Sequence, residues 1–353
     1  MSQYPKLPDS ILPDRTFRTA VVLGSLVLIL AGVHVAGAIM APMAFALVTI
    51  AVVWPIQSAL QEQLPKLVAL TITTIVVLAV LAALIYLLAW AFGLVVQWLI
   101  NNTARFQSLY AQAAEWFEQH GVSIKSLMIE SYDPSWTIGV LRDVGGRSYR
   151  LASFAAITFA FAVLGLLEVD VLRKNIQSLQ DEGFKRSLLK AAEDTADKFQ
   201  KYMLLRTVMS VLTGIIVWSF ALVAGIELAT AWGVIAFVFN YVPFIGPLFA
   251  TVFPTLFALV QFGSWELAIF VFVCLNVIQF VTGSYIEPRI AGATLSMSPF
   301  VVLFAVFFWS LLWGIPGAFI GVPIAIAILT ICEKQESTRW IATLLSGRDS
   351  SAA

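Results

Sequence analysis

Charged residues are scarce in this sequence of 353 residues. Asp, Glu, Lys and Arg make up 12% of it, whereas ordinary soluble domains carry about 25%. Hydrophobic residues instead reach 60%, and the mean hydropathy is +0.89. The few charges balance at 21 basic and 21 acidic side chains, so we expect no nucleic-acid partner. This composition predicts a polytopic membrane protein that is surrounded by the lipid bilayer.

Cysteine is also scarce, with only Cys274 and Cys332, and their spacing is not that of a metal site. Cys274 lies within an apolar run, so we expect no structural disulfide. The sequence contains no HExxH motif, no Walker A loop and no Ser-His pair placed for hydrolysis within a membrane. We therefore expect no enzyme, no metal site and no cofactor.

Long runs without Asp, Glu, Lys or Arg predict an all-α fold with about eight membrane segments, because about 20 apolar residues form a helix that crosses the hydrocarbon core. The first run, residues 19–61, is divided by Gly37 and Pro42 and predicts a tight hairpin of two spans. The remaining six segments are predicted within residues 67–104, 151–167, 207–226, 228–265, 267–286 and 290–332.

Two amphipathic stretches separate these segments. In residues 101–150, apolar side chains recur at helical spacing, and a loop is predicted from Asp133 to Arg150, around Gly145-Gly146. Residues 168–206 carry eight basic side chains and one apolar stripe, which predicts a helix on the membrane surface. The predicted divisions are a tail at 1–18, three spans at 19–100, a helix and loop at 101–150, a fourth span at 151–167, a charged helix at 168–206, a transport core at 207–332 and a tail at 333–353.

The distribution of Lys and Arg predicts the orientation, because these residues concentrate in cytoplasmic loops. Both tails and residues 168–206 are expected on the cytoplasmic side, and residues 101–150 on the outer side. Two topologies satisfy this arrangement. In one, the broken segments 228–265 and 290–332 each cross the membrane once. In the other, both are re-entrant hairpins that return to their own side.

The first broken segment, residues 228–265, is too long for one upright span. As a straight helix its 38 residues would extend about 57 Å, against a hydrocarbon core of about 30 Å. Pro243 and Pro247 each lack a backbone N–H, and Gly246 permits unusual backbone angles, so we expect no regular helix from Asn240 to Pro247. Such a break within a membrane is typical of a transport site.

Uncharged polar side chains around this break are candidate solute ligands. Asn240 adjoins the break, and Asn276 and Gln279 lie three residues apart, which places them on one helix face. The alternative is that these amides form hydrogen bonds between helices. The predicted solute-binding residues are Asn240, Tyr241, Pro243, Gly246, Pro247, Asn276 and Gln279.

Candidate gates and hinges follow the break. The sequence Glu287-Pro288-Arg289 ends a span, and it is either a gate or a cap with a local ion pair. Interruptions of the second broken segment are predicted at Gly314 to Gly317 and at Gly321 to Pro323, with close helix packing at its glycines. The predicted gate and hinge residues are Glu287, Pro288, Arg289, Gly314, Gly317, Gly321 and Pro323.

Two further titratable side chains lie in or beside the spans. His34 lies within the first span, where it is either functional or bonded to a neighbouring helix. Glu227 lies at a tight turn between spans, and we expect it to be solvated.

The second half of the chain resembles the autoinducer-2 exporter family of bacterial inner-membrane proteins. The motifs agree in order and spacing over about residues 200–330, and the first 200 residues agree in layout. The matching motifs are Asn240 to Pro247, Glu287 to Gly292, Ser298 to Val302 and Trp313 to Pro323. The resemblance implies an exporter of a small polar molecule, which for some members is autoinducer-2. It also implies a homo-oligomer, with a pentamer as one form.

We therefore expect a multi-pass secondary transporter that exports a small polar metabolite, such as autoinducer-2, across the bacterial inner membrane. The resemblance leaves open a sodium or lithium/proton antiporter, although Glu227, Glu266 and Glu287 flank the spans instead of lying at their centres. A membrane scaffold that docks partners through residues 168–206 is an alternative from another class.

Overall fold

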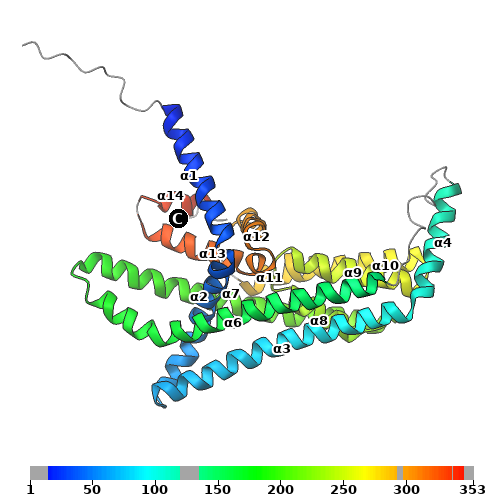
Figure 1. Cartoon of the computed structure of the whole chain (residues 1–353), viewed down its shortest axis with the longest axis horizontal. Helices are drawn as coiled ribbons and strands as arrows, with labels where there is room; N and C mark the ends of the chain where they lie inside the picture. The colour runs from blue at the N-terminus through cyan, green and yellow to red at the C-terminus, as the bar shows by residue number, and fades with distance from the viewer. Residues whose placement is uncertain (1–14, 120–134, 292–296, 336, 346–353) are drawn as a thin grey trace, which may run out of the picture.

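The computed structural model describes residues 15–119, 135–291, 297–335 and 337–345, and their regular structure is helical without a strand (Figure 1). Residues 1–14 and 346–353, which belong to the predicted tails, lie outside the described residues. Eight of the described helices are long and apolar enough to cross a membrane, and each corresponds to one predicted segment. The prediction of an all-α polytopic protein with about eight segments is confirmed.

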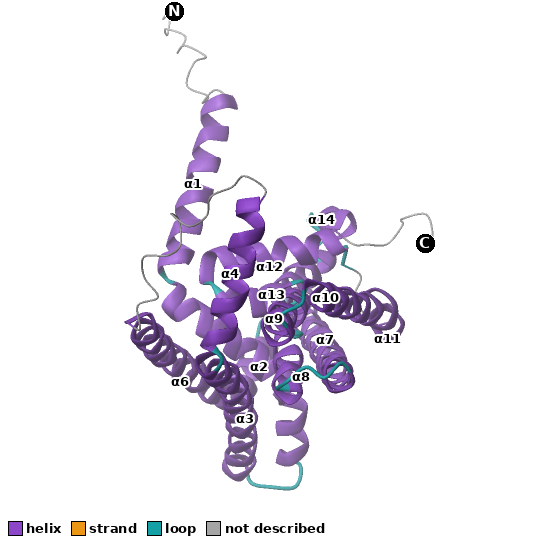
Figure 2. Ribbon diagram, turned by 90° about the vertical axis from the view of Figure 1, so that its right-hand side faces the viewer, coloured by secondary structure: helices purple, strands orange, loops and turns teal. Residues whose placement is uncertain are grey.

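Helices α1 (Arg15–Val35) and α2 (Gly37–Gln61) follow one another in the same general direction (Figures 1 and 2). Only Ala36 separates them, and its N–H still donates to the Gly32 carbonyl at 2.9 Å. The predicted tight hairpin is therefore wrong. One residue cannot reverse two helices, and Pro42 removes a single hydrogen bond from α2 without ending it.

Long helices then run along the length of the molecule (Figure 1). They are α3 (Lys66–Asn101), α6 (Ser135–Gln177) and α7 (Glu182–Val223), and the amphipathic α4 (Thr103–Gln119) follows α3. The loop predicted from Asp133 to Arg150 is wrong over residues 135–150, because α6 begins at Ser135 and continues through both glycines; residues 133 and 134 lie outside the described residues. Glycine lowers helix stability by only about 1 kcal/mol, which the length of this helix tolerates.

The charged region 168–206 is not one surface helix but a helical arm formed by the end of α6 and the start of α7 (Figure 1). Asp181 begins α7, where its carboxylate accepts a hydrogen bond from Phe184 N at 2.9 Å. Arg173 pairs with Glu193 across the two legs at 3.3 Å. Helix α7 continues from the arm into the fifth predicted span without interruption, so one helix joins the arm to the membrane part.

The first broken segment forms a helical hairpin of α8 (Ala229–Phe239) and α9 (Ile245–Phe262). Its legs are antiparallel, since the Phe239 and Phe249 rings stack at 4.3 Å near the tip, and Trp232 meets Phe257 at 5.1 Å nearer the base. Glu227 N donates to Gln261 Oε1 at 2.8 Å, so the two ends of the hairpin lie together. The segment thus returns to its own side instead of crossing once.

A single long element follows the first hairpin and leads to the second. It consists of α10 (Trp265–Phe280), the π-helix η1 (Val281–Ile286) and α11 (Glu287–Ala291).

The second broken segment is a hairpin of α12 (Pro299–Trp313) and α13 (Ile315–Lys334), which the short α14 (Arg339–Leu345) follows. A Cβ on Gly321 would lie 2.7 Å from the Ala305 carbonyl oxygen, and one on Gly317 would collide with the Trp309 carbonyl. The legs are therefore antiparallel and very close. The predicted interruption at Gly321 to Pro323 is wrong, because α13 continues through it.

Two apolar clusters hold these elements together. The first joins α3, α7, α8, α9 and α10 around Trp98, Trp232 and Leu275. The second joins the α7 residue Tyr202 and α13 to Val242, which lies in the turn between α8 and α9. The tip of the first hairpin is consequently packed between α7 and the second hairpin.

Candidate functional site

The chain turns between α8 and α9 at residues 240–244. Helix α8 ends before Pro243, whose ring prevents its continuation, and Phe244 adopts a left-handed φ of 64°. A positive φ is rare and strained for a bulky residue, and such strain often marks a functional position. The predicted break is confirmed here, but Ile245 to Pro247 form the first turn of α9. Pro247 fits there because an N–H in the first turn has no partner within the helix.

Gly246 allows α9 to begin directly against the end of α8. A Cβ at this position would lie 2.5 Å from the Phe239 carbonyl oxygen and 2.7 Å from Asn240 Cα. Both neighbours are backbone atoms, so no side-chain movement could make room. The structure thus gives Gly246 a packing role at the tip of the hairpin.

The polar groups of the tip face α7. Asn240 is buried, and its Nδ2 donates to Ser210 Oγ at 3.5 Å. The Tyr241 hydroxyl donates to Thr207 Oγ1 at 3.1 Å. Sequence reasoning missed Ser210 and Thr207, although two hydroxyls three residues apart in an apolar helix are a usable signal. The tip and α7 together therefore present an amide and three hydroxyls in an otherwise apolar region.

The other predicted amides separate in the structure. Asn276 is exposed, and its Nδ2 donates to the Phe272 carbonyl of its own helix at 2.8 Å. Gln279 is buried, and its Nε2 has no hydrogen-bond partner among the described residues. Positions three apart differ by about 60° around a helix, and here the edge of the buried face falls between them. The structure does not place Asn276 beside the tip.

Glu287 forms an ion pair with Arg206 of α7, not the predicted local pair with Arg289. The Arg206 guanidinium holds both carboxylate oxygens, at 3.0 and 3.3 Å, and the two side chains are 10% and 23% exposed. Arg289 instead donates to the Tyr285 hydroxyl at 2.8 Å and lies over that ring. The π-helix before Glu287 widens the turn and redirects this carboxylate toward α7.

Pro288 stands directly after Glu287, where the helix returns from π to α geometry. Proline has no N–H to donate, so one hydrogen bond of the ladder is missing where the pattern changes.

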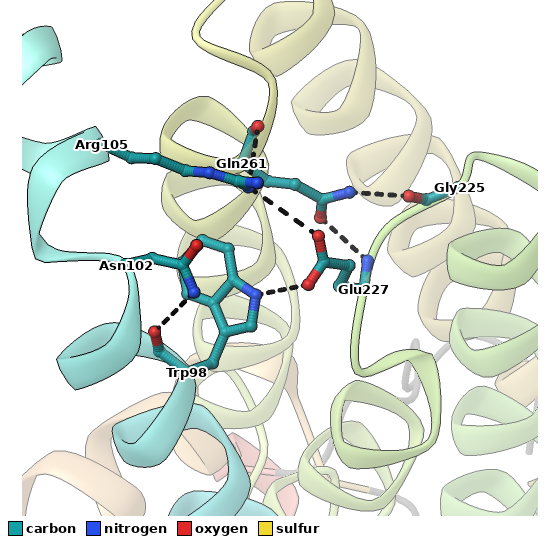
Figure 3. A network of polar contacts seen from close by, with 6 residues as sticks. All are labelled: Trp98, Asn102, Arg105, Gly225, Glu227 and Gln261. Atoms are coloured by element: carbon teal, nitrogen blue, oxygen red, sulfur yellow. Dashed lines mark hydrogen bonds and ion pairs between the residues drawn. The ribbon is translucent and has the colours of Figure 1, made fainter.

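A second polar network closes the base of the first hairpin (Figure 3). Trp98 Nε1 donates to Glu227 Oε2 at 2.5 Å, and Arg105 lies 3.8 Å from the other carboxylate oxygen. Gln261 Nε2 donates to the Gly225 carbonyl at 2.8 Å, while its amide oxygen accepts from Glu227 N. Glu227 is half-exposed, but both of its carboxylate oxygens and its backbone N–H have partners. The prediction that it is simply solvated is therefore wrong.

The tip of the second hairpin lies against α1. His34 Nδ1 is 2.8 Å from the Leu312 carbonyl, which confirms that His34 bonds to a neighbouring helix. Trp313 Nε1 donates to the Val33 carbonyl at 3.0 Å. Gly314 has φ 66° and ψ −143°, a conformation that is essentially restricted to glycine.

Gly317, Gly321 and Pro323 lie inside α13, where both glycines provide the predicted close packing. Val242 of the first tip belongs to the same apolar cluster as Ala318 and Val322. The first tip thus faces the middle of α13, while the tip around Gly314 faces α1.

A multi-pass helical protein with a strained, polar helix break in its membrane part has the architecture of a membrane transporter. The chain belongs to the AI-2E family of transporters, whose family model matches residues 23–336. This result confirms the resemblance inferred from the motifs.

Individual relatives match nearly the whole chain. The AI-2 transport protein TqsA of Escherichia coli (strain K12) is 28% identical over 93% of this chain and 95% of its own length. YhhT of the same strain, which is also named as a transport protein, is 28% identical over 94% of this chain and 95% of its own length. The protein is accordingly a multi-pass inner-membrane transporter.

Proposed function

We propose that this transporter exports a small polar metabolite, with autoinducer-2 as the first candidate, by secondary transport. The observation that carries the proposal is the polar tip of the first hairpin. Asn240 and Tyr241 meet Ser210 and Thr207 beside the break, so an amide and three hydroxyls gather at this point of the membrane part. Neutral amides and hydroxyls suit a solute that carries several hydroxyl groups. The name of TqsA supplies autoinducer-2 as the first solute to test.

The chemistry of the tip favours a neutral solute over a cation. Antiporters use carboxylates within the membrane to bind protons or metal ions. Glu287 is paired with Arg206, and Glu227 is bonded to Trp98 at the base of the hairpin. Among the described residues, no group of three or more His, Cys, Asp or Glu side chains could hold a metal ion. A sodium or lithium/proton antiporter remains the second candidate function.

The proposal includes a topology in which the charged arm and both termini are cytoplasmic. Its support is that Lys198 pairs with Glu333 at 2.8 Å and Lys334 pairs with Asp194, so the arm and the end of α13 lie side by side. A cysteine placed at Ser178, at the end of the arm, should react with an impermeant thiol reagent in inside-out vesicles. Reaction on intact cells would contradict the topology.

We also propose that the protein works as a homo-oligomer, with the pentamer implied by the resemblance as its form. Large apolar side chains along α3 and α10 are exposed in the single chain and offer helix faces for neighbouring copies. Native mass spectrometry in mild detergent should show multiples of 38.6 kDa. A single species of one chain would contradict the oligomer.

Export is tested with two matched asparagine variants. Inside-out vesicles should accumulate labelled autoinducer-2, and Asn240→Ala should raise its apparent KM about tenfold, because one hydrogen bond contributes about 1 kcal/mol or somewhat more. Asn276→Ala removes the same amide from an exposed position and should leave transport unchanged. If both variants transport like the parent, the tip does not bind the solute. If the parent accumulates no autoinducer-2 but exchanges sodium for protons, the antiporter is correct.

A further inference from the structure

Arg206 carries a charge that is largely removed from solvent at the start of the membrane part of α7. Its side chain is 10% exposed and forms a bidentate pair with Glu287, the first residue of α11. The guanidinium also lies over the Tyr202 ring, 5.5 Å from its centroid. A planar guanidinium that holds both oxygens of one carboxylate fixes the two helices in one relative position.

This ion pair adjoins the tip of the first hairpin. Thr207, the next residue after Arg206, accepts the hydrogen bond of the Tyr241 hydroxyl. Tyr202, one turn earlier, packs in the same cluster as Val242 of the tip. A displacement of α11 from α7 would therefore reach the tip through residues that are in contact with it.

Two features indicate that the pair has a second arrangement. The π-helix Val281–Ile286 directly precedes Glu287, and a change of this segment to α geometry that shifts the register by one residue would rotate the carboxylate by about 100° around the helix axis. In addition, Arg206 Nε and the Tyr202 hydroxyl are buried without a hydrogen-bond partner of ordinary geometry among the described residues. Buried polar groups that lack a partner are uncommon in folded proteins and call for an explanation, which a second arrangement would supply.

We propose that Arg206 and Glu287 form a lock that closes the polar tip on the side of the charged arm and opens once in each transport cycle. The lock rests on the proposed transport function, but its opening can be measured without any solute. Opening separates α11 from α7 and uncovers Ser210, which is fully buried beneath Asn240. Glu287 and Arg206 are thus positioning residues for the tip.

The test measures the reactivity of a buried cysteine. In a chain with Cys274→Ser and Cys332→Ser, Ser210→Cys should react slowly with N-ethylmaleimide in membrane vesicles. Glu287→Gln should increase this rate about tenfold, because loss of the ion pair shifts the population toward the open form. Glu266→Gln makes the same change at an exposed residue at the other end of α10 and should have no effect.

Two further variants separate a lock from general loosening. Exchange of the charges in Arg206→Glu with Glu287→Arg should restore slow reaction of the cysteine at position 210. A cysteine at Ala91, which is fully buried in the other apolar cluster, should stay unreactive when Glu287→Gln is present. Equal acceleration at both reporters, or no acceleration at position 210, would overturn the lock. A parent that transports no autoinducer-2 would overturn the proposed solute without affecting this result.

Discussion

Both helical hairpins of this transporter turn at a residue with a positive φ, but the side chains at their tips differ. The first turns over residues 240–244 and places an amide and a phenol against hydroxyls of α7. The second turns at Gly314 alone, and its neighbour Trp313 bonds to the carbonyl of Val33 in α1. A break within a membrane segment therefore does not by itself define a solute site. The side chains that the turn carries, and the surface they meet, make the difference.

The legs of the two hairpins also pack differently. In the second, Gly317 and Gly321 bring α13 against carbonyl groups of α12. In the first, stacked aromatic rings such as Phe239 and Phe249 separate the legs, and glycine allows close approach only at Gly246 beside the tip. Small residues let helix backbones approach closely, and neighbouring backbone atoms leave little room for movement there. We infer that the second hairpin is a rigid surface, and that the tip of the first hairpin moves against it.

The largest effect on folding stability is expected where the two legs of the second hairpin lie closest to each other. Gly321→Leu would place a side chain within 2.7 Å of the Ala305 carbonyl, and backbone atoms cannot rotate away. We expect a loss of more than about 3 kcal/mol in folding stability, beyond ordinary overpacking. Fluorescence-detected size-exclusion chromatography should show little folded protein. Gly93→Leu, on an open stretch of α3, should elute like the parent, and normal elution of Gly321→Leu would contradict the rigidity of the second hairpin.

A substitution at Gly246 is expected to lower folding stability less than one at Gly321. Its main effect is expected on transport. Gly246→Ala adds one methyl group that meets the backbone of Phe239 and Asn240, so α9 must shift away from α8. We expect a cost of about 1–3 kcal/mol, which leaves the protein folded but displaces the polar tip. Vesicle transport should fall to background, while the yield of folded protein stays near that of the parent. Full transport by this variant would mean that the position of the tip is not critical.

Much of the fold could be predicted from the sequence because uncharged runs and their lengths follow directly from the thickness of a membrane. The break at Pro243 and the close packing at Gly317 follow likewise from local chemistry. The continuation of α6 through Gly145-Gly146 was missed, since packing and helix length outweigh the local preference of glycine. The partners of Glu287 and Glu227 could not be predicted, because Arg206 and Trp98 are distant in sequence and meet them only through the fold.

The smallest effects are expected from matched losses of one hydrogen bond at each tip. Tyr241→Phe removes the bond to Thr207 at the first tip, and Trp313→Phe removes the bond to Val33 at the second. A single bond contributes about 0.5–1.5 kcal/mol, so both variants should fold and show modestly lower melting temperatures. If only the first tip binds solute, Tyr241→Phe should raise the apparent KM severalfold. Trp313→Phe should leave the KM unchanged, because its bond joins α12 to α1 and involves none of the polar groups of α7. An equal increase in KM for both variants would show that the second tip also shapes the site, and the contrast between the two hairpins would then fail.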